Sequence, residues 1–476
     1  MDYYATVLST DDPAAARGPV IAVIGAGASG TLAVIHLLRE AMARRVPLRV
    51  ALIDRHGRHG LGQAYSTTHP AHLLNSPADA MSALAGDPGH LTRWAAAAGL
   101  RHDGFLPRSA YGRYLRELLE STERAALPAA RVGHLTSDVI AIRRSGRGRA
   151  LRLYLAADGR IDADAVVLAT GNLPPVPPCP LPDNDRYIAD PWEPGALRAA
   201  TDGSPVIVLG TGLSMLDVAI AVTGADPRTV VYAVSRHALL PLPHHWPRPA
   251  ARVQPVIRRT EAPLRLAALI RDVRASAAQY AGDWQDIVDA LRPQVPRLWE
   301  QLPETDKRAF LRLAARHWEV HRHRVPPATA RRVGALRSAG QLSVLRGRVT
   351  EAGAEPGGVR VRIEASGSDT SLPAGWLINC TGPGGDITAT ADPLLRHLLD
   401  AGLARPDPLR LGLDADARGV LRDAAGRPCG DIFTLGPPLR GRWYETTAIP
   451  EIRGQAAALA RLLVTTRALA GSGSAA

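Results

Sequence analysis

The feature that most constrains the fold is a glycine-rich turn between a short apolar run and a helical stretch. The run PVIAVI, residues 19–24, ends in GAGASG, and the following TLAVIHLLREAMARR has the apolar spacing of a helix. A second apolar run, residues 48–53, ends at Asp54. This order of strand, turn, helix and strand predicts a β-α-β unit of a parallel sheet.

Three glycines in that turn have the spacing of a dinucleotide-binding motif. Gly25 permits the tight turn, Gly27 permits close approach of a pyrophosphate, and Gly30 permits close packing of the helix on the strand. The helix N-terminus, with Ser29 in its first turn, then points towards the phosphates. Asp54, 24 residues after Gly30, can accept hydrogen bonds from a ribose and so favours FAD or NAD. The alternative is a turn that only packs.

The same pattern occurs a second time. The run PVIVL, residues 205–209, precedes GTGLSML, the helical stretch DVAIAVTGA and the apolar run VVYAVS. Gly210 and Gly212 keep their places, whereas Met215 replaces the third glycine, so we expect this helix to stand further from its strand or to tilt.

The residues around the second turn favour NADPH. Ser214 falls in the first turn of the helix, where a hydroxyl can contact a phosphate, and Asp217 suits the positive end of the helix dipole. Arg236 follows the second strand, in the place that Asp54 has in the first unit, and a cation there fits a 2′-phosphate. The alternative is that Arg236 is one more surface arginine.

The charge and cysteine content exclude several other classes. The net charge is +12, but the basic residues are scattered arginines and Lys307 is the only lysine, so we interpret the surplus as solvated surface and expect no nucleic-acid partner. Three distant cysteines give neither C-x-x-C nor a disulfide framework. The acidic start lacks a signal sequence and no run of 18 apolar residues occurs, which predicts a cytoplasmic protein without a membrane span.

The 476 residues are enough for several domains. We predict an α/β fold with two Rossmann-like dinucleotide-binding domains, as in glutathione-reductase-like flavoproteins, and a helical insertion. The predicted boundaries are residues 1–195 plus 375–476 for a discontinuous FAD-binding domain, 200–260 plus 325–374 for an NADPH-binding domain, and 261–324 for the helical insertion.

Several longer segments carry a family resemblance. They are VIGAGASG, LGQAYSTTHPAHLLNSPADAMSAL, VVLATGNLPP, VLGTGLSMLD, INCTGPG and YETTAIPEIRGQAAALA. Together they resemble the FAD/NAD(P)-binding protein family related to class B flavin monooxygenases and N-hydroxylases. Within it, the pattern is most similar to the nitrosuccinate-forming L-aspartate N-monooxygenases of natural-product biosynthesis.

The resemblance implies an FAD- and NADPH-dependent monooxygenase. Such an enzyme N-oxidises the amine of a small acidic amino acid such as L-aspartate with O2, through a C4a-hydroperoxyflavin, towards a hydroxylamine or nitro product. This chemistry needs no protein nucleophile, so we expect no catalytic side chain. Two alternatives stay open: an NAD(P)H-dependent flavin oxidoreductase without oxygen insertion, and a non-catalytic flavin-binding regulatory protein. A homodimer is also left open.

The resemblance also implies further contacts with the cofactors. The residues are Gln63, Asn75, Met81, Thr170, Gly171, Thr446 and Thr447. The loop GPPLRGRWYETT should lie against the flavin, and its Arg440 and Arg442 can bind a substrate carboxylate, with Arg292 of the helical insertion as a third candidate. His321 and His323 lack ligand partners at metal-binding spacing, so we expect no metal site.

Overall fold

A six-stranded sheet forms the centre of one half of the molecule in the computed structural model, which describes residues 18–145, 151–182, 184–247, 264–365 and 367–472. In spatial order its strands are β16 (Val420–Arg422), β17 (Pro428–Thr434), β7 (Ala165–Leu168), β1 (Val20–Ile24), β2 (Leu48–Asp54) and β3 (Ala130–Thr136). The strands from β17 to β3 are parallel, and β16 pairs antiparallel with β17. The first predicted β-α-β unit is therefore present.

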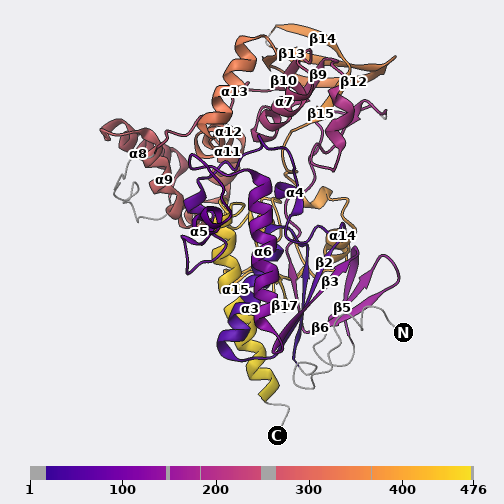
Figure 1. Ribbon diagram of the computed structural model, residues 1–476, viewed down its shortest axis with the longest axis vertical. Coiled ribbons are helices and arrows are strands. Elements are labelled where there is room, and N and C mark those ends of the chain that lie inside the picture. The colour runs from indigo at the N-terminus through magenta and orange to yellow at the C-terminus, as the bar shows by residue number, and fades with distance from the viewer. Residues whose placement is uncertain (1–17, 146–150, 183, 248–263, 366, 473–476) are drawn as a thin grey trace.

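The two faces of this sheet have different covers (Figure 1). The helices on one face are α3 (Ala28–Arg44), α6 (Arg108–Ala126) and α15 (Ile449–Ser472). The other face carries α14 (Pro393–Asp400) and an antiparallel sheet of β4 (Val139–Arg144), β5 (Leu151–Leu155) and β6 (Arg160–Ala163). Side chains alternate along β1 between the two cores: Ile21 and Val23 face the helices, and Ala22 and Ile24 face the other layer. Burial on both faces explains the continuous apolar run.

The other half repeats this design around a five-stranded parallel sheet. In spatial order its strands are β11 (Leu342–Arg346), β10 (Val231–Ser235), β9 (Val206–Leu209), β15 (Trp376–Asn379) and β8 (Tyr187–Ile188). One face packs on helices α7 (Leu213–Ala225) and α13 (Pro327–Ser338). The other packs on an antiparallel sheet of β12 (Arg348–Glu355), β13 (Gly358–Ala365) and β14 (Ser368–Ala374).

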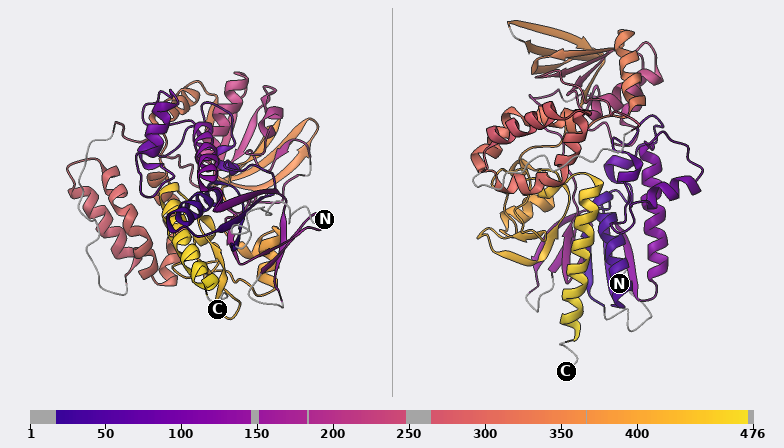
Figure 2. Two further views of the ribbon diagram at one scale, coloured as in Figure 1. Left: turned by 60° about the horizontal axis from the view of Figure 1, so that its bottom comes forward. Right: turned by 90° about the vertical axis from the view of Figure 1, so that its left-hand side faces the viewer.

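A group of short helices lies at the level where the two halves meet (Figures 1 and 2). Its members are α8 (Leu266–Gln279), α9 (Trp284–Leu291), α10 (Val295–Gln301), α11 (Glu304–Leu313) and α12 (Ala315–Arg322). They share a small core with Leu409 and Tyr444, which belong to the C-terminal part of the chain. The remaining short elements are α4 (Gly62–Tyr65), α5 (His90–Ala97) and 3-10 turns at Ala78–Ala80, Ala196–Thr201, Arg292–Gln294, Ile387–Ala389 and Pro437–Leu439.

Two segments contradict the predicted domain boundaries. We assigned β15 and β8 to the FAD-binding domain, but both belong to the second sheet, where Trp376 lies beside Val206 in parallel register. The prediction was wrong here because a short, wholly apolar run fits either sheet, and register is set by tertiary packing. The boundary predicted at residues 260–261 lies outside the described residues. The remaining division into domains stays a proposal.

Within the described ranges, no helix combines the length and apolar character needed to cross a bilayer.

Candidate functional site

The carboxyl ends of four parallel strands meet at one edge of the first sheet. The glycine turn follows β1, Asp54 ends β2, residues 169–171 follow β7, and Gly436 lies just beyond β17. We call residues 25–30, Asp54, residues 169–171 and Gly436 the first cradle. In open parallel sheets, ligands bind outside the carboxyl ends of the strands.

Two glycines of the first cradle, Gly25 and Gly30, leave no room for a side chain. Gly25 has φ of +97°, and a Cβ there would lie 2.4 Å from the carbonyl oxygen of Ala169. A Cβ on Gly30 would lie 1.8 Å from the carbonyl oxygen of Gly25. Gly27 precedes α3, and no side chain caps this helix. Its first N–H groups are therefore available to an anion, which fits the pyrophosphate of a dinucleotide.

Asp54 is held as a carboxylate by the backbone. Its Oδ2 accepts a hydrogen bond from Ala26 N at 3.1 Å, and its Oδ1 accepts from His56 N at 3.0 Å and Arg58 N at 3.1 Å. Burial by itself would raise the pKa of Asp54, but these N–H groups outweigh it and lower the pKa below its ordinary value. A carboxylate has about four acceptor positions, so capacity remains for a ribose hydroxyl.

The loop after β17 closes one side of the first cradle. Ser29 is buried, and a Cβ on Gly436 would lie 2.7 Å from its Oγ, so the two residues are in close contact. Gly436 N donates to Gln455 Oε1 at 2.7 Å, and Thr446 Oγ1 donates to Gly436 O at 3.2 Å. Thr446 is fully buried and supports this loop, whereas Thr447 is exposed beside it.

A small pocket adjoins the same edge. Thr170 and Gly171 line it together with Pro437, Pro438 and Arg440. The structure thus brings together Gly171, which follows β7, and Arg440, which follows β17. These residues were predicted separately as a cofactor contact and a substrate contact.

Three predicted cofactor residues lie in the segment between β2 and α5. Gln63 is exposed, and its Nε2 donates to Asp190 Oδ2 at 2.6 Å. Asn75 O accepts a hydrogen bond from His244 Nε2 at 2.9 Å. Met81 is buried in the core on the helix side of the first sheet. Their roles towards a cofactor stay predictions.

The second cradle has the same turn. We define it as residues 210–215, Ser235, Arg236 and residues 380–382. Gly210 has φ of +104°, and a Cβ there would lie 2.3 Å from the carbonyl oxygen of Cys380. No side chain caps α7, and a Cβ on Gly212 would have no neighbour within 4 Å. This turn is open and also fits a nucleotide phosphate.

Two residues of α7 lie deeper than the sequence suggests. Met215 is fully buried in the core of the second sheet. Asp217 is also buried and lies 2.6 Å from Arg108 of the first half, so it joins the halves instead of facing a phosphate. Burial raises the pKa of Asp217 to about 6, although Arg108 opposes this. Ser214 stays half-buried at the start of the helix.

Positive charge gathers at the end of β10. Arg236 is exposed and forms no ion pair with another described residue. Burial lowers the pKa of His237, and the nearby Arg236, Arg346 and Arg316 lower it further. Ser235 Oγ is bonded to Thr211 Oγ1 at 2.9 Å. The arrangement fits an anionic group such as a 2′-phosphate, with Arg236 as its freest cation.

The three arginines predicted to bind substrate are all engaged within the chain. Each is paired with a glutamate: Arg292 with Glu451 at 2.6 Å, Arg440 with Glu319 at 3.3 Å, and Arg442 with Glu300 at 2.8 Å. The first pair is bidentate, since Arg292 Nε and Nη2 donate to the two carboxylate oxygens of Glu451. Any substrate carboxylate at these positions would have to compete with a glutamate.

Sequence reasoning missed a buried ion pair beside these arginines. Arg322, at the end of α12, has Nη2 3.2 Å from Oε2 of Glu445, and both side chains are almost fully buried. Burial alone would raise the pKa of Glu445, but Arg322 and the other donors around it lower it. One signal was present in the sequence: Glu445 directly precedes Thr446 in a segment already expected to lie near the flavin.

The comparisons with known proteins begin with a family match. Residues 22–173, which contain most of the first cradle, match a family model described as FAD-NAD(P)-binding. An uncharacterized protein of Escherichia coli strain K12, YdhS, is 25% identical over 222 residues, or 42% of this chain. That alignment spans 39% of the length of YdhS.

Two solved structures resemble nearly the whole chain. One is an ornithine N-hydroxylase from Kutzneria sp. 744 with reduced FAD, NADP+ and L-ornithine, at 17% identity and a TM-score of 0.63 over 95% of this chain and 100% of that one. The other is L-lysine 6-monooxygenase from Pseudomonas syringae, at 14% identity and a TM-score of 0.62 over 94% and 99%. These likenesses confirm the predicted fold class of two Rossmann-like domains.

Proposed function

We propose that the protein is an FAD- and NADPH-dependent N-monooxygenase. Its proposed substrate is a small acidic amino acid, L-aspartate, whose amine is oxidised towards a hydroxylamine or nitro product. The observation that carries the proposal is the whole-chain likeness to an N-hydroxylase structure that holds reduced FAD, NADP+ and an amino acid. The two cradles of this chain supply matching places for the two nucleotides.

The residues of each cradle suggest a division of labour. In the first, the turn at Gly25, the N-terminus of α3, which no side chain caps, and the fixed carboxylate of Asp54 would hold FAD. In the second, the open turn at Gly212 and the cation at Arg236 would hold NADPH. When bound, FAD would accept hydride from NADPH and, once reduced, activate O2 for transfer of one oxygen atom to the amine.

A second candidate is an NAD(P)H-dependent flavin oxidoreductase without oxygen insertion. It is favoured by the pairing of all three predicted substrate arginines with glutamates, which leaves none of them unpaired for a carboxylate. A dithiol version of this function is disfavoured, because Cys179, Cys380 and Cys429 are all free thiols far apart in the chain.

The test mixes the FAD-loaded protein with NADPH, air and single amino acids. The panel is L-aspartate, L-glutamate, L-ornithine and L-lysine, with succinate as a matched control that lacks the amine. We expect L-aspartate to stimulate O2 uptake and to give an N-oxidised product by mass spectrometry, and succinate to give none. NADPH oxidation at the same rate with and without every amino acid, with no nitrogen product, would favour the oxidoreductase.

A further inference from the structure

Among the described residues, Arg322 has two buried guanidinium nitrogens without a hydrogen-bond partner, whereas Arg131, Arg324 and Arg442 have one each. Arg322 is 8% exposed, and its Nε and Nη2 are buried without a hydrogen-bond partner. Nη2 is close to Glu445 Oε2 at 3.2 Å, so the charges attract, but the atoms are not aligned for a hydrogen bond. Leaving such donors unsatisfied is unfavourable, and more so for a charged group. A partner is therefore expected at this edge.

The unsatisfied atoms are the pair that an arginine uses to grip a carboxylate. Nε and Nη2 lie on one edge of the planar guanidinium and can donate two parallel hydrogen bonds. The neighbouring Arg292 shows this use directly, since its Nε and Nη2 each donate to one oxygen of Glu451 at 2.6 Å. Arg322 presents the same edge without a hydrogen bond, and the carboxylate of Glu445, 3.2 Å from Nη2, is the group that a ligand would have to displace or share.

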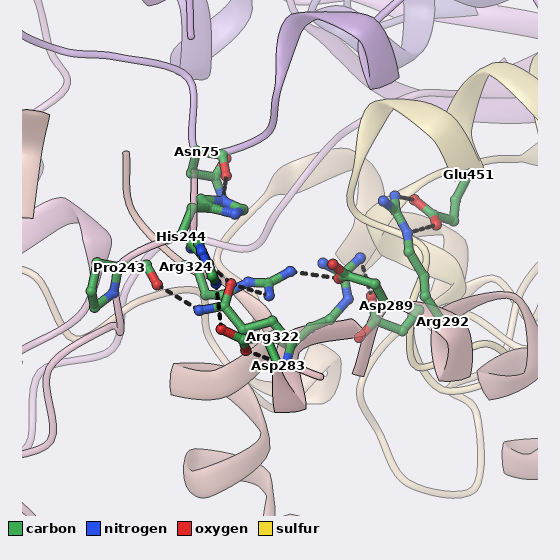
Figure 3. A network of polar contacts seen from close by, with 12 residues as sticks. Asn75, Pro243, His244, Asp283, Asp289, Arg292, Arg322, Arg324 and Glu451 are labelled. Carbon is green, nitrogen blue, oxygen red and sulfur yellow. Dashed lines mark hydrogen bonds and ion pairs between the residues drawn. The ribbon is translucent and has the colours of Figure 1, made fainter. Parts of the chain in front are cut away.

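The position of Arg322 suits a substrate group. Figure 3 shows it between Arg324, which bonds to Asp289, and Arg292, which bonds to Glu451 in the first turn of α15. Its ion-pair partner Glu445 lies next to Thr446, which supports the loop at Gly436 in the first cradle.

The same network reaches the other predicted flavin segment. His244 bonds to the carbonyl oxygen of Asn75, and Gln285 links the chain at Pro243 to Arg324. Arg322 thus lies among side chains that connect two segments expected to border the flavin.

The electrostatics agree with a missing anion. Burial lowers the pKa of Arg322 below its ordinary value, and the positive charge of Arg292 contributes, although Glu445 opposes both. A carboxylate bound to the free edge would reverse this, because an opposite charge close to a buried cation favours the charged form.

We propose that the free edge of Arg322 binds the carboxylate of the substrate. The inference rests on the proposed function for the identity of the substrate, and it replaces Arg292, Arg440 and Arg442 with Arg322 as the residue that selects a carboxylate-bearing amine. Arg322 is a binding residue in this account and takes no part in the oxidation itself.

The test is direct binding of succinate, a dicarboxylate without an amine, to the FAD-loaded protein by calorimetry. Arg322→Lys keeps the charge but cannot donate two parallel hydrogen bonds, so we expect at least tenfold weaker binding. Arg144→Lys is the matched control, because Arg144 also holds a carboxylate, that of Asp431, but in the first half away from the cradles. It should bind succinate within twofold of the wild type.

A second variant covers the case in which Arg322→Lys fails to fold. Arg322→Met combined with Glu445→Gln removes both buried charges together, which avoids an uncompensated carboxylate. This double variant should also bind succinate at least tenfold more weakly. FAD content and unfolding temperature near the wild-type values show that each variant is folded.

The outcomes separate this inference from the proposed function. Equal succinate affinity in Arg322→Lys and wild type, or no succinate binding by the wild type, would overturn the inference. Arg322-dependent succinate binding without any N-oxidised amino acid would support the site and count against the proposed function. If Arg322→Lys formed an N-oxidised product at unchanged KM, the proposed function would be supported, but Arg322 would not be the residue that binds the substrate carboxylate.

Discussion

The first and second cradles each contain a glycine turn of the same shape, but they differ in what lies over the turn. Gly25 and Gly210 both have positive φ, and both pack against the carbonyl oxygen of the strand-end residue next to them. A Cβ on Gly27 would meet the Cα of Gly62 at 3.5 Å, whereas a Cβ on Gly212 would meet nothing within 4 Å. One turn is covered by its own chain and the other is open.

The side chains at the strand ends also differ, since one is fixed and the other is exposed. Asp54 is fixed by three backbone N–H groups, while Arg236 is exposed at the corresponding place. A covered turn with a fixed acceptor suits a nucleotide that stays bound, and an open turn with an exposed cation suits one that exchanges. The same backbone motif is thus adapted by what lies over it and by one residue at the strand end.

We expect the greatest loss of cofactor binding when a side chain fills the glycine turn of the first cradle. In Gly30→Ala the new Cβ would lie 1.8 Å from the carbonyl oxygen of Gly25, so helix and strand must separate. We expect FAD content, measured by absorbance of the purified protein, to fall below about a tenth of the wild-type value. Gly454→Ala in α15 is the control, because its Cβ would have no neighbour within 4 Å. Full FAD content in Gly30→Ala would contradict the assignment of this turn.

The next prediction concerns how Asp217 and Asp54 make stability depend on pH. The pKa of Asp217 is raised to about 6 by burial, so the unfolded state loses its proton first, and the folded state loses stability as pH rises from about 4 to 6. Relative to Asp217→Asn, the wild type should lose up to about 3 kcal/mol over this window. Urea unfolding at several pH values measures this difference.

Asp54 should behave in the opposite way. Its pKa is lowered by the backbone N–H groups despite burial, so its contribution is complete above the ordinary pKa and is lost as pH falls below about 4. The difference between Asp54→Asn and wild type should therefore be constant from pH 5 to 7 and shrink in stronger acid. A difference that changes between pH 5 and 7 would contradict the lowered pKa.

A smaller effect concerns the choice of nicotinamide nucleotide. Arg236→Gln removes the freest cation at the end of β10, so we expect KM for NADPH to rise about tenfold, or about 1.4 kcal/mol, with little change for NADH. Steady-state flavin reduction with each nucleotide measures this. Arg228→Gln, at an exposed arginine paired with Asp226, should leave both constants unchanged. An equal rise of KM for NADPH and NADH would contradict the assignment of Arg236 to the 2′-phosphate.

The smallest effect comes from the open turn. Gly212 has φ of −85°, and an alanine there meets no protein atom, so Gly212→Ala should fold normally. Its methyl group would lie where a pyrophosphate approaches, and we expect KM for NADPH to rise several-fold with FAD content unchanged. Loss of FAD in this variant would show that the two cradles are not separate sites.

Both cradles could be predicted because their chemistry is local. Gly25, Asp54 and Gly210 lie in short segments whose strand, turn and helix are written in neighbouring residues. The sheet that contains β15 could not be predicted, because WLIN is apolar throughout and fits a buried strand of either sheet.

The partners of the arginines could not be predicted for a related reason. Glu451 lies 159 positions from Arg292, and the chain contains many other acids. The stretch that holds Arg322 has the pattern of a helix, but burial of a guanidinium leaves no pattern in the sequence. Tertiary packing determines these contacts, and the periodicity of the sequence does not predict them.

Whether the protein is an N-monooxygenase is tested most sharply by tracing the source of the oxygen in the product. The FAD-loaded protein is given NADPH, L-aspartate and 18O2 in ordinary water, and the nitrogen product is weighed by mass spectrometry. We expect an N-oxidised aspartate whose new N–O oxygen carries the label from O2. Complete oxidation of NADPH with bound FAD and no labelled nitrogen product would contradict it.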